Sequence, residues 1–203
     1  MKRNKSWIER QDKDPFVQQA QNNGYRSRAV YKLQAIDKKD RLFRSGQTIV
    51  DLGAAPGSWS QYVSEKIQPD GKIIAVDILD MPAVSNVDFI QGDFSDPSVF
   101  ERCLAITGTR QVDLVISDLA PNLSGVRDTD QARSMHLADL VLEFACQALS
   151  AKGSLLIKLF QGQGTDGYRK ELNAKFQKVM VRKPDASRES SREFYILARG
   201  FKI

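Results

Sequence analysis

The sequence lacks the features that mark several common protein classes. None of its 203 residues belongs to a run of about 18 consecutive apolar residues, the length that a membrane span needs. The basic N-terminus is not followed by the apolar segment of a secretory signal peptide. No membrane association is therefore expected, and the cytoplasm is the default location.

Cysteine and histidine are scarce. Cys103 and Cys146 lie far apart and form no CxxC pattern, and His136 is the one histidine. This set provides neither a disulfide framework nor the ligand cluster of a zinc site. We expect no metal site, and we interpret His136 as a helix-surface or core residue without chemistry.

Charge is unevenly distributed, although the net charge is only +5. Residues 1–45, 46–168 and 169–203 carry net charges of +7, −8 and +6. A basic surface built from both chain ends is typical of nucleic-acid binders, whereas segregated solvated charge is the alternative. The residues expected to flank a cleft and contact RNA phosphates are Lys2, Arg3, Lys5, Arg10, Lys13, Arg26, Arg28, Arg182, Lys183, Arg188 and Arg192.

Strand and helix patterns alternate along the chain, with no internal repeat. Apolar segments predict strands at 48–51, 72–77, 87–91, 112–117 and 154–160, and amphipathic segments predict helices at 28–36, 58–67 and 134–149. This alternation predicts an α/β, Rossmann-like fold with helices on both faces of a mostly parallel sheet.

The C-terminal part follows a different pattern. Segments 178–182 and 194–198 read as strands with no helix between them, so they predict an antiparallel hairpin that completes a seven-stranded sheet. We expect two parts of the chain: a basic, flexible N-terminal arm over residues 1–23 and a single domain over residues 24–203.

Ligands of such sheets bind beyond the carboxyl ends of the strands. Gly53 and Gly57 follow the first strand, in a turn that lacks the G-x-G-x-x-G fingerprint. Asp77, Asp93 and Asp118 follow the next three strands. One such acid is more often a turn or cap residue, but three beside a glycine loop favour an adenosine ligand that carries a positive group. S-adenosylmethionine fits this description.

Lys158 interrupts the apolar segment LLIKLF, where a parallel strand should be buried on both faces. Lysine is rare in such strands unless it is paired or functional, and we weigh a structural and a functional role equally. The sequence alone gives Lys32 and Glu193 ordinary surface roles, and it allows Trp59 to pack a helix on the sheet.

Six ordered motifs resemble the FtsJ/RrmJ family of ribosomal RNA large-subunit 2′-O-methyltransferases: DLGAAPGSWSQYV, AVDILDM, QGDFSD, SDLAPNLSG, KLFQG and VRKPDASRESSREFYI. The resemblance extends from about Tyr25 to the C-terminus. It implies a class I S-adenosylmethionine-dependent methyltransferase fold. The cofactor contacts that it implies come from Gly53, Gly57, Trp59, Asp77, Asp93 and Asp118.

The resemblance also implies a catalytic set and a substrate. The catalytic residues would be Lys32, Asp118, Lys158 and Glu193, with Lys158 as the proton acceptor. Within the cofactor set, Asp77 would hold the ribose hydroxyls and Asp93 the adenine amino group. The substrate would be a uridine ribose in the A-loop of 23S ribosomal RNA within the assembled large subunit. No obligatory protein partner is inferred.

Other functions remain compatible with the sequence. A non-catalytic ribosome-assembly factor on the same fold, or a 2′-O-methyltransferase of another RNA, would share most of these features. An NAD-dependent oxidoreductase would need a pyrophosphate loop that GAAPG does not supply. A base or protein-amine methyltransferase would usually carry an aromatic residue where DLAPN has none.

Overall fold

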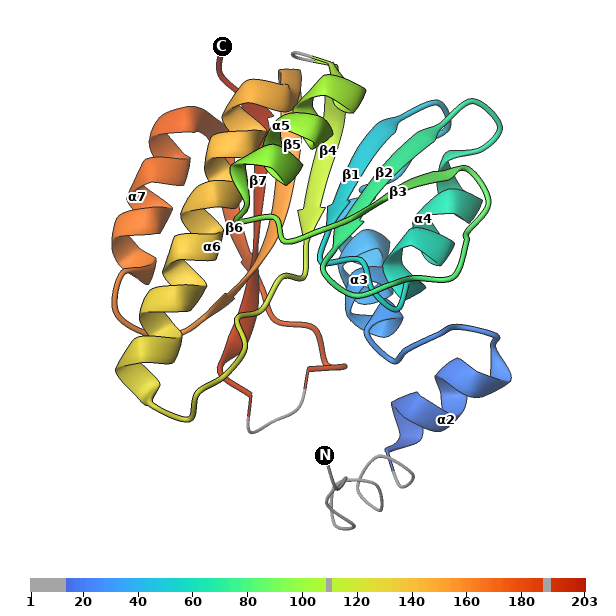
Figure 1. Cartoon of the computed structure of the whole chain (residues 1–203), viewed down its shortest axis with the longest axis horizontal. Coiled ribbons are helices and arrows are strands. Elements are labelled where there is room, and N and C mark those ends of the chain that lie inside the picture. The colour runs from blue at the N-terminus through green and yellow to red at the C-terminus, as the bar shows by residue number, and fades with distance from the viewer. Residues whose placement is uncertain (1–13, 109–110, 188–190) are drawn as a thin grey trace.

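A seven-stranded sheet with helices on both faces forms the centre of the molecule (Figure 1). The computed structural model describes residues 14–108, 111–187 and 191–203. The strands are β1 (Thr48–Leu52), β2 (Lys72–Asp77), β3 (Val87–Gln91), β4 (Val112–Ser117), β5 (Leu149–Phe160), β6 (Phe176–Arg182) and β7 (Glu193–Phe201). The helices are α2 (Pro15–Asn22), α3 (Val30–Asp40), α4 (Ser58–Ile67), α5 (Pro97–Thr107), α6 (Arg127–Ala148) and α7 (Thr165–Lys175).

The strands lie in the order β3-β2-β1-β4-β5-β7-β6. Strands β1 to β5 pair in parallel, whereas β7 runs antiparallel to both of its neighbours, β5 and β6. The mostly parallel sheet and the C-terminal hairpin are therefore confirmed. The later strand of the hairpin is the inner one, and β6 forms the edge.

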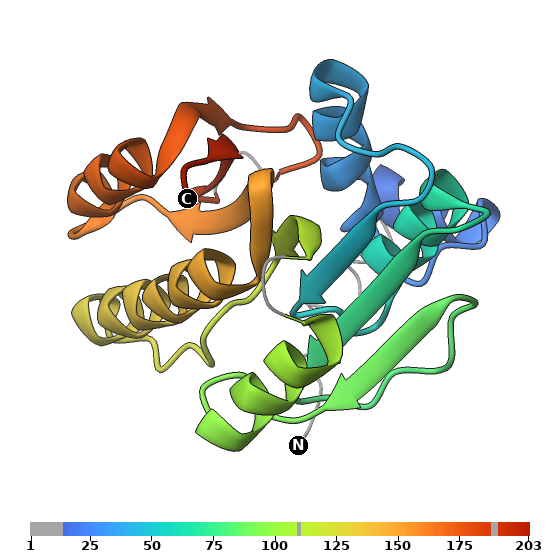
Figure 2. The same ribbon diagram turned by 90° about the horizontal axis from the view of Figure 1, so that it is seen from above.

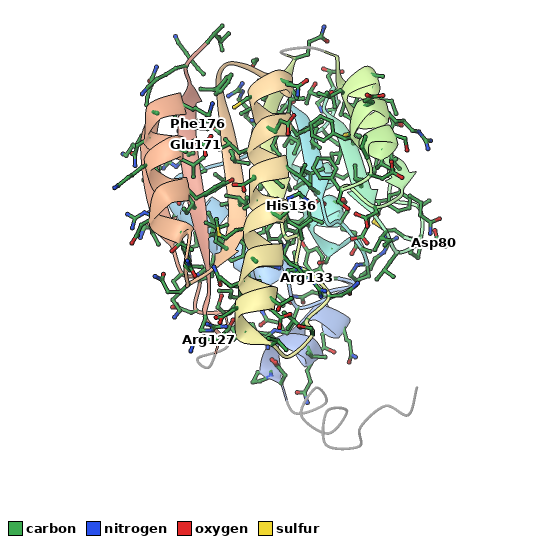
Figure 3. The ribbon with its side chains drawn as sticks, turned by 60° about the vertical axis from the view of Figure 1, so that its left-hand side comes forward. Asp80, Arg127, Arg133, His136, Glu171 and Phe176 are labelled. Carbon is green, nitrogen blue, oxygen red and sulfur yellow. The ribbon has the colours of Figure 1, made fainter. Side chains whose placement is uncertain are left out.

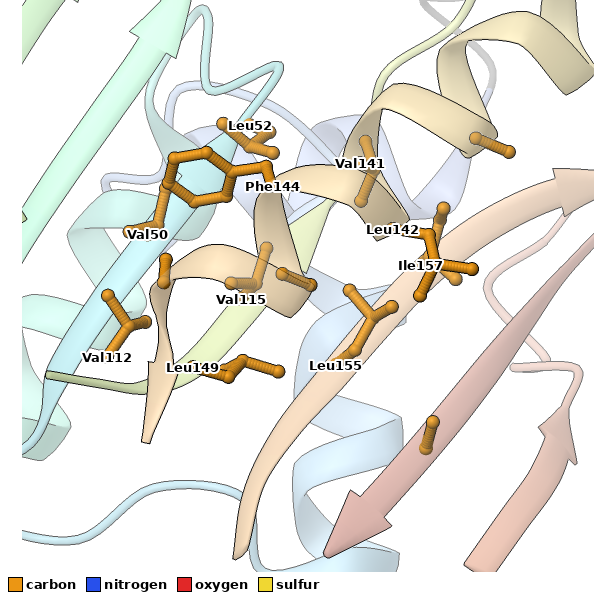
Figure 4. Close-up of a cluster of buried hydrophobic side chains, with 14 of the residues drawn as sticks. Val50, Leu52, Val112, Val115, Val141, Leu142, Phe144, Leu149, Leu155 and Ile157 are labelled. Atoms are coloured by element: carbon orange, nitrogen blue, oxygen red, sulfur yellow. The ribbon is translucent and has the colours of Figure 1, made fainter. Parts of the chain in front are cut away.

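Alternate residues of the central strands build a separate core on each face of the sheet. Val50 and Leu52 of β1 pack in a cluster with side chains of α5, α6 and α7, and Figure 4 shows Phe144 of α6 beside them. Ile49 instead packs with residues of α2, α3 and α4. Because both faces are covered (Figure 2), the ends of the strands are the part of the sheet open to a ligand.

The expected flexible arm contains a helix. The side chain of Asp14 accepts a hydrogen bond from the Phe16 amide at 3.1 Å, and Pro15 occupies the first turn of α2. Ala20 is buried, and the Phe16 ring centroid lies 5.6 Å from that of Tyr31 in α3. Capping and packing therefore order residues 15–22, whereas residues 1–13 lie outside the described residues.

Other elements also differ from the sequence prediction. Helix α6 begins at Arg127, seven residues before the predicted start, and α3 covers Val30–Asp40 rather than 28–36. Helices α5 and α7 were not predicted. In the described ranges, no helix combines the length and apolar character needed to cross a lipid bilayer.

Candidate active site

A cavity of about 1000 Å³ lies at the carboxyl ends of the parallel strands. It is open to solvent and combines carboxylates with apolar side chains. Its lining includes the three predicted strand-end acids and residues of the loops that follow β1, β2, β3 and β4: Gly53, Ala55, Asp77, Ile78, Leu79, Gly92, Asp93, Phe94, Ser95, Asp118, Leu119, Ala120, Pro121 and Asn122. This is the position at which an α/β sheet binds its ligand.

The loop after β1 needs its glycines. Gly53 has φ +83°, and a Cβ atom there would lie 2.9 Å from the Leu119 amide nitrogen. Gly57 has φ +104°, and its Cβ would lie 2.6 Å from the Arg26 guanidinium. Only glycine allows the β1 loop, the β4 loop and Arg26 to approach so closely.

Gly57 also precedes α4, which leaves the first peptide N–H groups of that helix without intrahelical acceptors. These groups and the helix dipole favour an anion at this end of α4. Trp59 belongs to this first turn.

The indole ring of Trp59 does not line the cavity. It is only 3% exposed, donates a hydrogen bond from Nε1 to the Ala29 carbonyl at 2.8 Å, and packs 6.0 Å from the Tyr195 ring. Of the predicted cofactor residues, Gly53, Asp77, Asp93 and Asp118 line the cavity, whereas Gly57 and Trp59 do not.

Asp77 and Asp93 shape the loops around the cavity. The Asp77 carboxylate accepts hydrogen bonds from the amides of Ala55 at 2.9 Å and Leu79 at 2.8 Å, so it joins the loops after β1 and β2. Asp93 accepts from the amide and hydroxyl of Ser95. Each carboxylate oxygen has two lone pairs, so both side chains retain acceptor capacity for a ligand.

Lys158 and Asp118 form an ion pair at the edge of the cavity. Lys158 Nζ lies 3.1 Å from Asp118 Oδ1 and donates a hydrogen bond to the Asp118 carbonyl oxygen at 2.6 Å. The lysine side chain is 7% exposed and the aspartate side chain 20%. The charge in the middle of an apolar strand is thus paired, and Asp118 connects it to the cavity.

Lys32 and Glu193 form a second pair. Lys32 Nζ lies 2.6 Å from Glu193 Oε1, and their side chains are 14% and 11% exposed. The structure therefore brings the four predicted catalytic residues together as two ion pairs. Neither Lys32 nor Glu193 is the ordinary surface residue that its local sequence suggests.

Strand pairing links the two pairs. Lys158 is opposite Tyr195, and Phe160 is opposite Glu193, in the antiparallel β5–β7 ladder. These four strand residues therefore share one face of the sheet, which places Glu193 on the same face as Lys158. The Tyr195 hydroxyl donates to Asp118 Oδ1 at 2.9 Å. Burial, followed by the charges of Asp118 and Glu193, raises the pKa of Tyr195 well above its ordinary value. Tyr195 therefore stays neutral and acts as a hydrogen-bond donor that fixes Asp118.

Tyr195 and the residues of α6 are parts of the site that were not predicted from the sequence. Tyr195 lies two residues after Glu193, so it lies on the same face, and this spacing was the available signal. Figure 3 shows Arg133 and His136 along α6, and both residues line the cavity. His136 is on the helix surface, as interpreted, but that surface is a wall of the site.

Three of the basic residues expected to contact RNA are bound within the protein. Arg26 donates to the carbonyls of Pro56, Pro82 and Ala83, and Arg28 pairs with Asp14. Arg182 forms two hydrogen bonds of 2.6 Å with Asp40. Lys183 and Arg192 remain exposed, beside Glu193, in a hollow of about 530 Å³. Lys2, Arg3, Lys5, Arg10, Lys13 and Arg188 lie outside the described residues.

The chain is similar to known proteins over its whole length. The chain is 50% identical to the ribosomal RNA large subunit methyltransferase E of Marinobacter nauticus over the full length of both proteins. It is 53% identical to the protein of the same name from Pseudomonas aeruginosa, with 99% of this chain and 97% of the relative covered.

A solved structure and a family profile extend this similarity. A crystal structure from Plasmodium falciparum, described as that of a ribosomal RNA methyltransferase, superposes with a TM-score of 0.78 at 30% identity, covering 87% of this chain and 98% of that one. The profile of the FtsJ-like methyltransferases matches residues 25–201. The chain therefore belongs to the FtsJ-like methyltransferase family.

Proposed function

We propose that the protein transfers a methyl group from S-adenosylmethionine to a ribose 2′-hydroxyl of large-subunit ribosomal RNA. The observation that carries the proposal is the nearly buried Lys158 paired with Asp118, a residue that also lines the cavity. The names of the bacterial relatives support large-subunit ribosomal RNA as the substrate. The motif resemblance supports a uridine of the 23S A-loop, modified in the assembled subunit in the cytoplasm.

The residues of the cavity fit the proposed cofactor. Asp77 would accept hydrogen bonds from the ribose hydroxyls and Asp93 one from the adenine amino group. Ile78 and Leu79 are 57% and 65% exposed at the cavity wall and offer apolar surface to the adenine ring. The glycine loop permits close approach of its backbone, and the first N–H groups of α4 suit a carboxylate. Bound S-adenosylmethionine supplies a methyl group made electrophilic by the sulfonium charge.

Lys158 has the hydrogen-bonding arrangement that a proton acceptor needs here. To act in this way, the Lys158 ammonium of the ion pair must first lose one proton, which leaves an amine with two N–H donors and one lone pair. Asp118 offers two oxygens to Nζ, at 2.6 and 3.1 Å. With both donors directed to Asp118, the lone pair is available to the proton of the 2′-hydroxyl. The resulting ammonium group is then stabilised by the Asp118 carboxylate. General-base action of this kind contributes about 10²- to 10⁴-fold in rate.

Lys32 and Glu193 would position the nucleotide. They lie beside the Lys158 site through the β5–β7 ladder, and the exposed cations Lys183 and Arg192 flank Glu193. Cations beside the reaction site suit the phosphates next to the target ribose, and such contacts do not read the base. Alignment of two bound reactants can lower the barrier by about 7 to 11 kcal/mol, so positioning is a major part of the proposed catalysis.

The test uses methyl-labelled S-adenosylmethionine with large subunits, or their RNA, from cells that lack the enzyme. After digestion to nucleosides, we expect labelled 2′-O-methyluridine. Lys158→Ala should reduce the label at least 10²-fold and leave cofactor affinity within a few fold, because Lys158 acts on the hydroxyl. Lys170→Ala, which removes an exposed lysine of α7, is the control and should retain full activity.

Each alternative function has its own outcome in this experiment. Cofactor binding without labelled RNA would favour an assembly factor. Label in a base or in a different RNA would replace the proposed substrate. Loss of cofactor affinity in Lys158→Ala would contradict the role assigned to this residue.

A further inference from the structure

A second concave site lies at the opposite end of the sheet from the cavity. It is a hollow of about 320 Å³ at the amino ends of β1 and β4. Its walls are the residue after α3, the loop that leads into β1, the first part of β5 and the last part of β7: Arg41, Leu42, Arg44, Gln47, Asp113, Leu114, Ser150, Ala151, Lys152, Gly153, Ser154 and Arg199. A hollow of this size and polarity accommodates a small anionic group.

Cations outnumber anions around this hollow. Its lining contains Arg41, Arg44, Lys152 and Arg199, with Asp113 as the single acid. Asp113 is already occupied, because it pairs with Arg44 at 3.0 Å and accepts the Thr48 amide at 2.9 Å. Arg41 and Lys152 are exposed, and neither forms an ion pair with any residue of the described ranges. The hollow therefore carries a net positive charge.

The neighbouring acid Asp40 does not neutralise this charge. Arg182 holds its carboxylate through two hydrogen bonds of 2.6 Å, and these bonds lower the pKa of Asp40. Arg199 uses Nη2 on the backbone carbonyls of Asp40 and Arg41. Its buried Nε has no hydrogen-bond acceptor within the part of the chain that the structure describes. A buried donor without an acceptor is unfavourable, and the guanidinium of Arg199 adds its positive charge to the lining of the hollow.

Two of these cations, Arg41 and Lys152, belong to residues with an unusual backbone conformation. Val112 pairs with Leu149 and Leu114 with Ser154, so residues 150–153 of β5 bulge out opposite Asp113 alone. Lys152, within this bulge, has φ +66°, and Arg41 has φ +51°. Side-chain-bearing residues rarely adopt this left-handed conformation, and glycine adopts it readily. Both positions nevertheless carry a long cationic side chain.

We propose that this hollow binds a backbone phosphate of the RNA substrate, as a contact remote from the methylated ribose. The proposal rests on RNA being the substrate, as inferred above. Lys152 lies in the bulge and Lys158 near the other end of β5, and the regular strand from Ser154 to Lys158 alone spans about 13 Å. An RNA that fills both sites must therefore extend from one end of the sheet to the other, which large-subunit RNA is large enough to do. Phosphate contacts of this kind fix register and orientation.

Glycine substitutions test the proposal without disturbing the fold. Arg41→Gly/Lys152→Gly removes two cations from the hollow, and its thermal stability should equal or exceed that of the parent because both positions have positive φ. We expect affinity for deproteinised large-subunit RNA to fall about tenfold at physiological salt, and the slope of log K against log salt to become shallower by about 1 to 2. The catalytic rate at saturating RNA should not change, whereas KM should rise.

Single variants separate the loss of a cation from the hollow from the loss of a cation elsewhere on the surface. Lys152→Gly should weaken RNA binding, whereas Arg102→Ala, which removes one exposed cation from α5, should not. Equal RNA affinity and salt slope in the parent and the double variant would overturn the proposal. RNA binding is measured without turnover, so its result does not depend on methylation. Absence of RNA methylation by the parent protein would count against the proposed function instead.

A free polyphosphate is the alternative ligand for the hollow, because it offers the same phosphate groups as RNA. Calorimetry with inorganic tripolyphosphate distinguishes it from RNA. If the double variant loses tripolyphosphate binding and retains full RNA affinity, the site serves a free anion and the RNA contact is wrong. If both affinities fall together, the RNA contact is supported.

Discussion

Asp51 is a fully buried carboxyl group that the proposed chemistry does not use. It lies in β1, where Oδ2 accepts a hydrogen bond from the Ser60 hydroxyl at 2.7 Å and Oδ1 has no partner in the described ranges. Burial raises the pKa of Asp51 from 3.8 to about 7, and the charges of Asp118 and Asp77 act in the same direction. Asp51 therefore takes up a proton on folding at moderately acidic pH.

This proton uptake predicts a pH-dependent stability. Between about pH 4 and 7 the unfolded chain loses the Asp51 proton and the folded chain keeps it, so the free energy of unfolding decreases as pH rises. The difference between the pKa values of the folded and unfolded states corresponds to about 4 kcal/mol at most. Asp51→Asn removes this dependence. From pH 5 to pH 8, the free energy of unfolding of the variant should therefore rise by about 2 to 4 kcal/mol relative to that of the parent.

Denaturant unfolding at the two pH values measures this change. Asp96→Asn serves as the control, because Asp96 is an exposed helix cap whose hydrogen bonds with Ser98 lower its pKa. Its variant should lose stability rather than gain it at pH 8. A constant difference between Asp51→Asn and the parent would show that the buried carboxyl does not titrate in this range.

Tyr195→Phe tests whether the tyrosine hydroxyl positions Asp118. The variant removes the hydroxyl contact of Asp118 Oδ1 and leaves its contact with Lys158 Nζ. A carboxylate that is free to rotate should hold Lys158 less well, and we expect kcat to fall about tenfold, equivalent to about 1.4 kcal/mol, with KM for RNA unchanged.

The control is Tyr168→Phe, which removes a buried hydroxyl that donates to the Ala138 carbonyl at 2.9 Å, away from the site. It should cost a similar amount of stability, about 1 kcal/mol, and leave kcat unchanged. The same kcat in Tyr195→Phe and the parent would remove Tyr195 from the site.

At the scale of elements, the Lys32–Glu193 pair ties α3 to β7. Because both side chains are nearly nine-tenths buried, removing one partner leaves the other charge poorly solvated. Lys32→Met and Glu193→Gln should each cost about 2 kcal/mol or more of unfolding free energy. The double variant should cost less than the sum of the two, by about 1 to 2 kcal/mol.

The exposed pair Arg44–Asp113 provides the comparison for this double-mutant cycle. Arg44 is 72% exposed, so the coupling of this pair should stay below about 1 kcal/mol. Equal coupling in the two cycles would mean that burial gives the Lys32–Glu193 pair no special strength. The measurement is chemical unfolding of all variants at one salt concentration.

Much of the sheet could be predicted because its strands are short, apolar and β-branched. The predicted bounds of β2, β3 and β4 agree with the structure. Helix α7 was missed because only Thr165, Tyr168 and Leu172 of its eleven residues are buried. They share one face of the helix, but this stripe is narrow and includes a threonine, so the apolar pattern is weak. Helix α5 did carry a signal that was not used, since Asp96 and Pro97 form a typical helix start.

The sequence predicts only those site residues whose type and position directly after a strand indicate a function. Asp77, Asp93 and Asp118 follow their strands and line one cavity, as the parallel topology requires. Tyr195 depends on the register between β5 and β7, and His136 on the rotation of α6. Both are tertiary properties, and the spacing of Tyr195 from Glu193 predicts only that the two side chains share a face. Strand β5 likewise begins at Leu149 rather than at the predicted Ser154, and the bulge at residues 150–153 lies in the part that was not predicted.

On the scale of the whole molecule, the basic chain ends serve two purposes. Arg26, Arg28 and Arg182 hold loops and helices in place, whereas Lys183 and Arg192 remain available to a ligand. The net charge of a segment therefore overestimates the surface that it offers to RNA. The acidic middle of the chain supplies the strand-end carboxylates of the cavity.

Binding of S-adenosylmethionine should stabilise the whole fold. A ligand at 100 times its Kd adds about 2.7 kcal/mol, which raises the Tm of a protein of this size by about 5 to 10 °C. NAD at the same concentration should produce no shift, because the glycine loop lacks the dinucleotide pattern. Thermal melts with either ligand measure this, and an equal shift with NAD would reopen the oxidoreductase alternative.

The position of β7 between β5 and β6 imposes an order on assembly. β7 follows both of its neighbours in sequence, so the facing edges of β5 and β6 have no strand to pair with until β7 is in place. Until then, the unpaired edge of β5 can associate with other chains. Pairings of such long sequence separation form slowly. Glu193 and Tyr195 arrive with β7, whereas Asp118 and Lys158 belong to strands that can pair earlier. A refolding chain should thus complete the proposed catalytic set, and become active, only when β7 has docked.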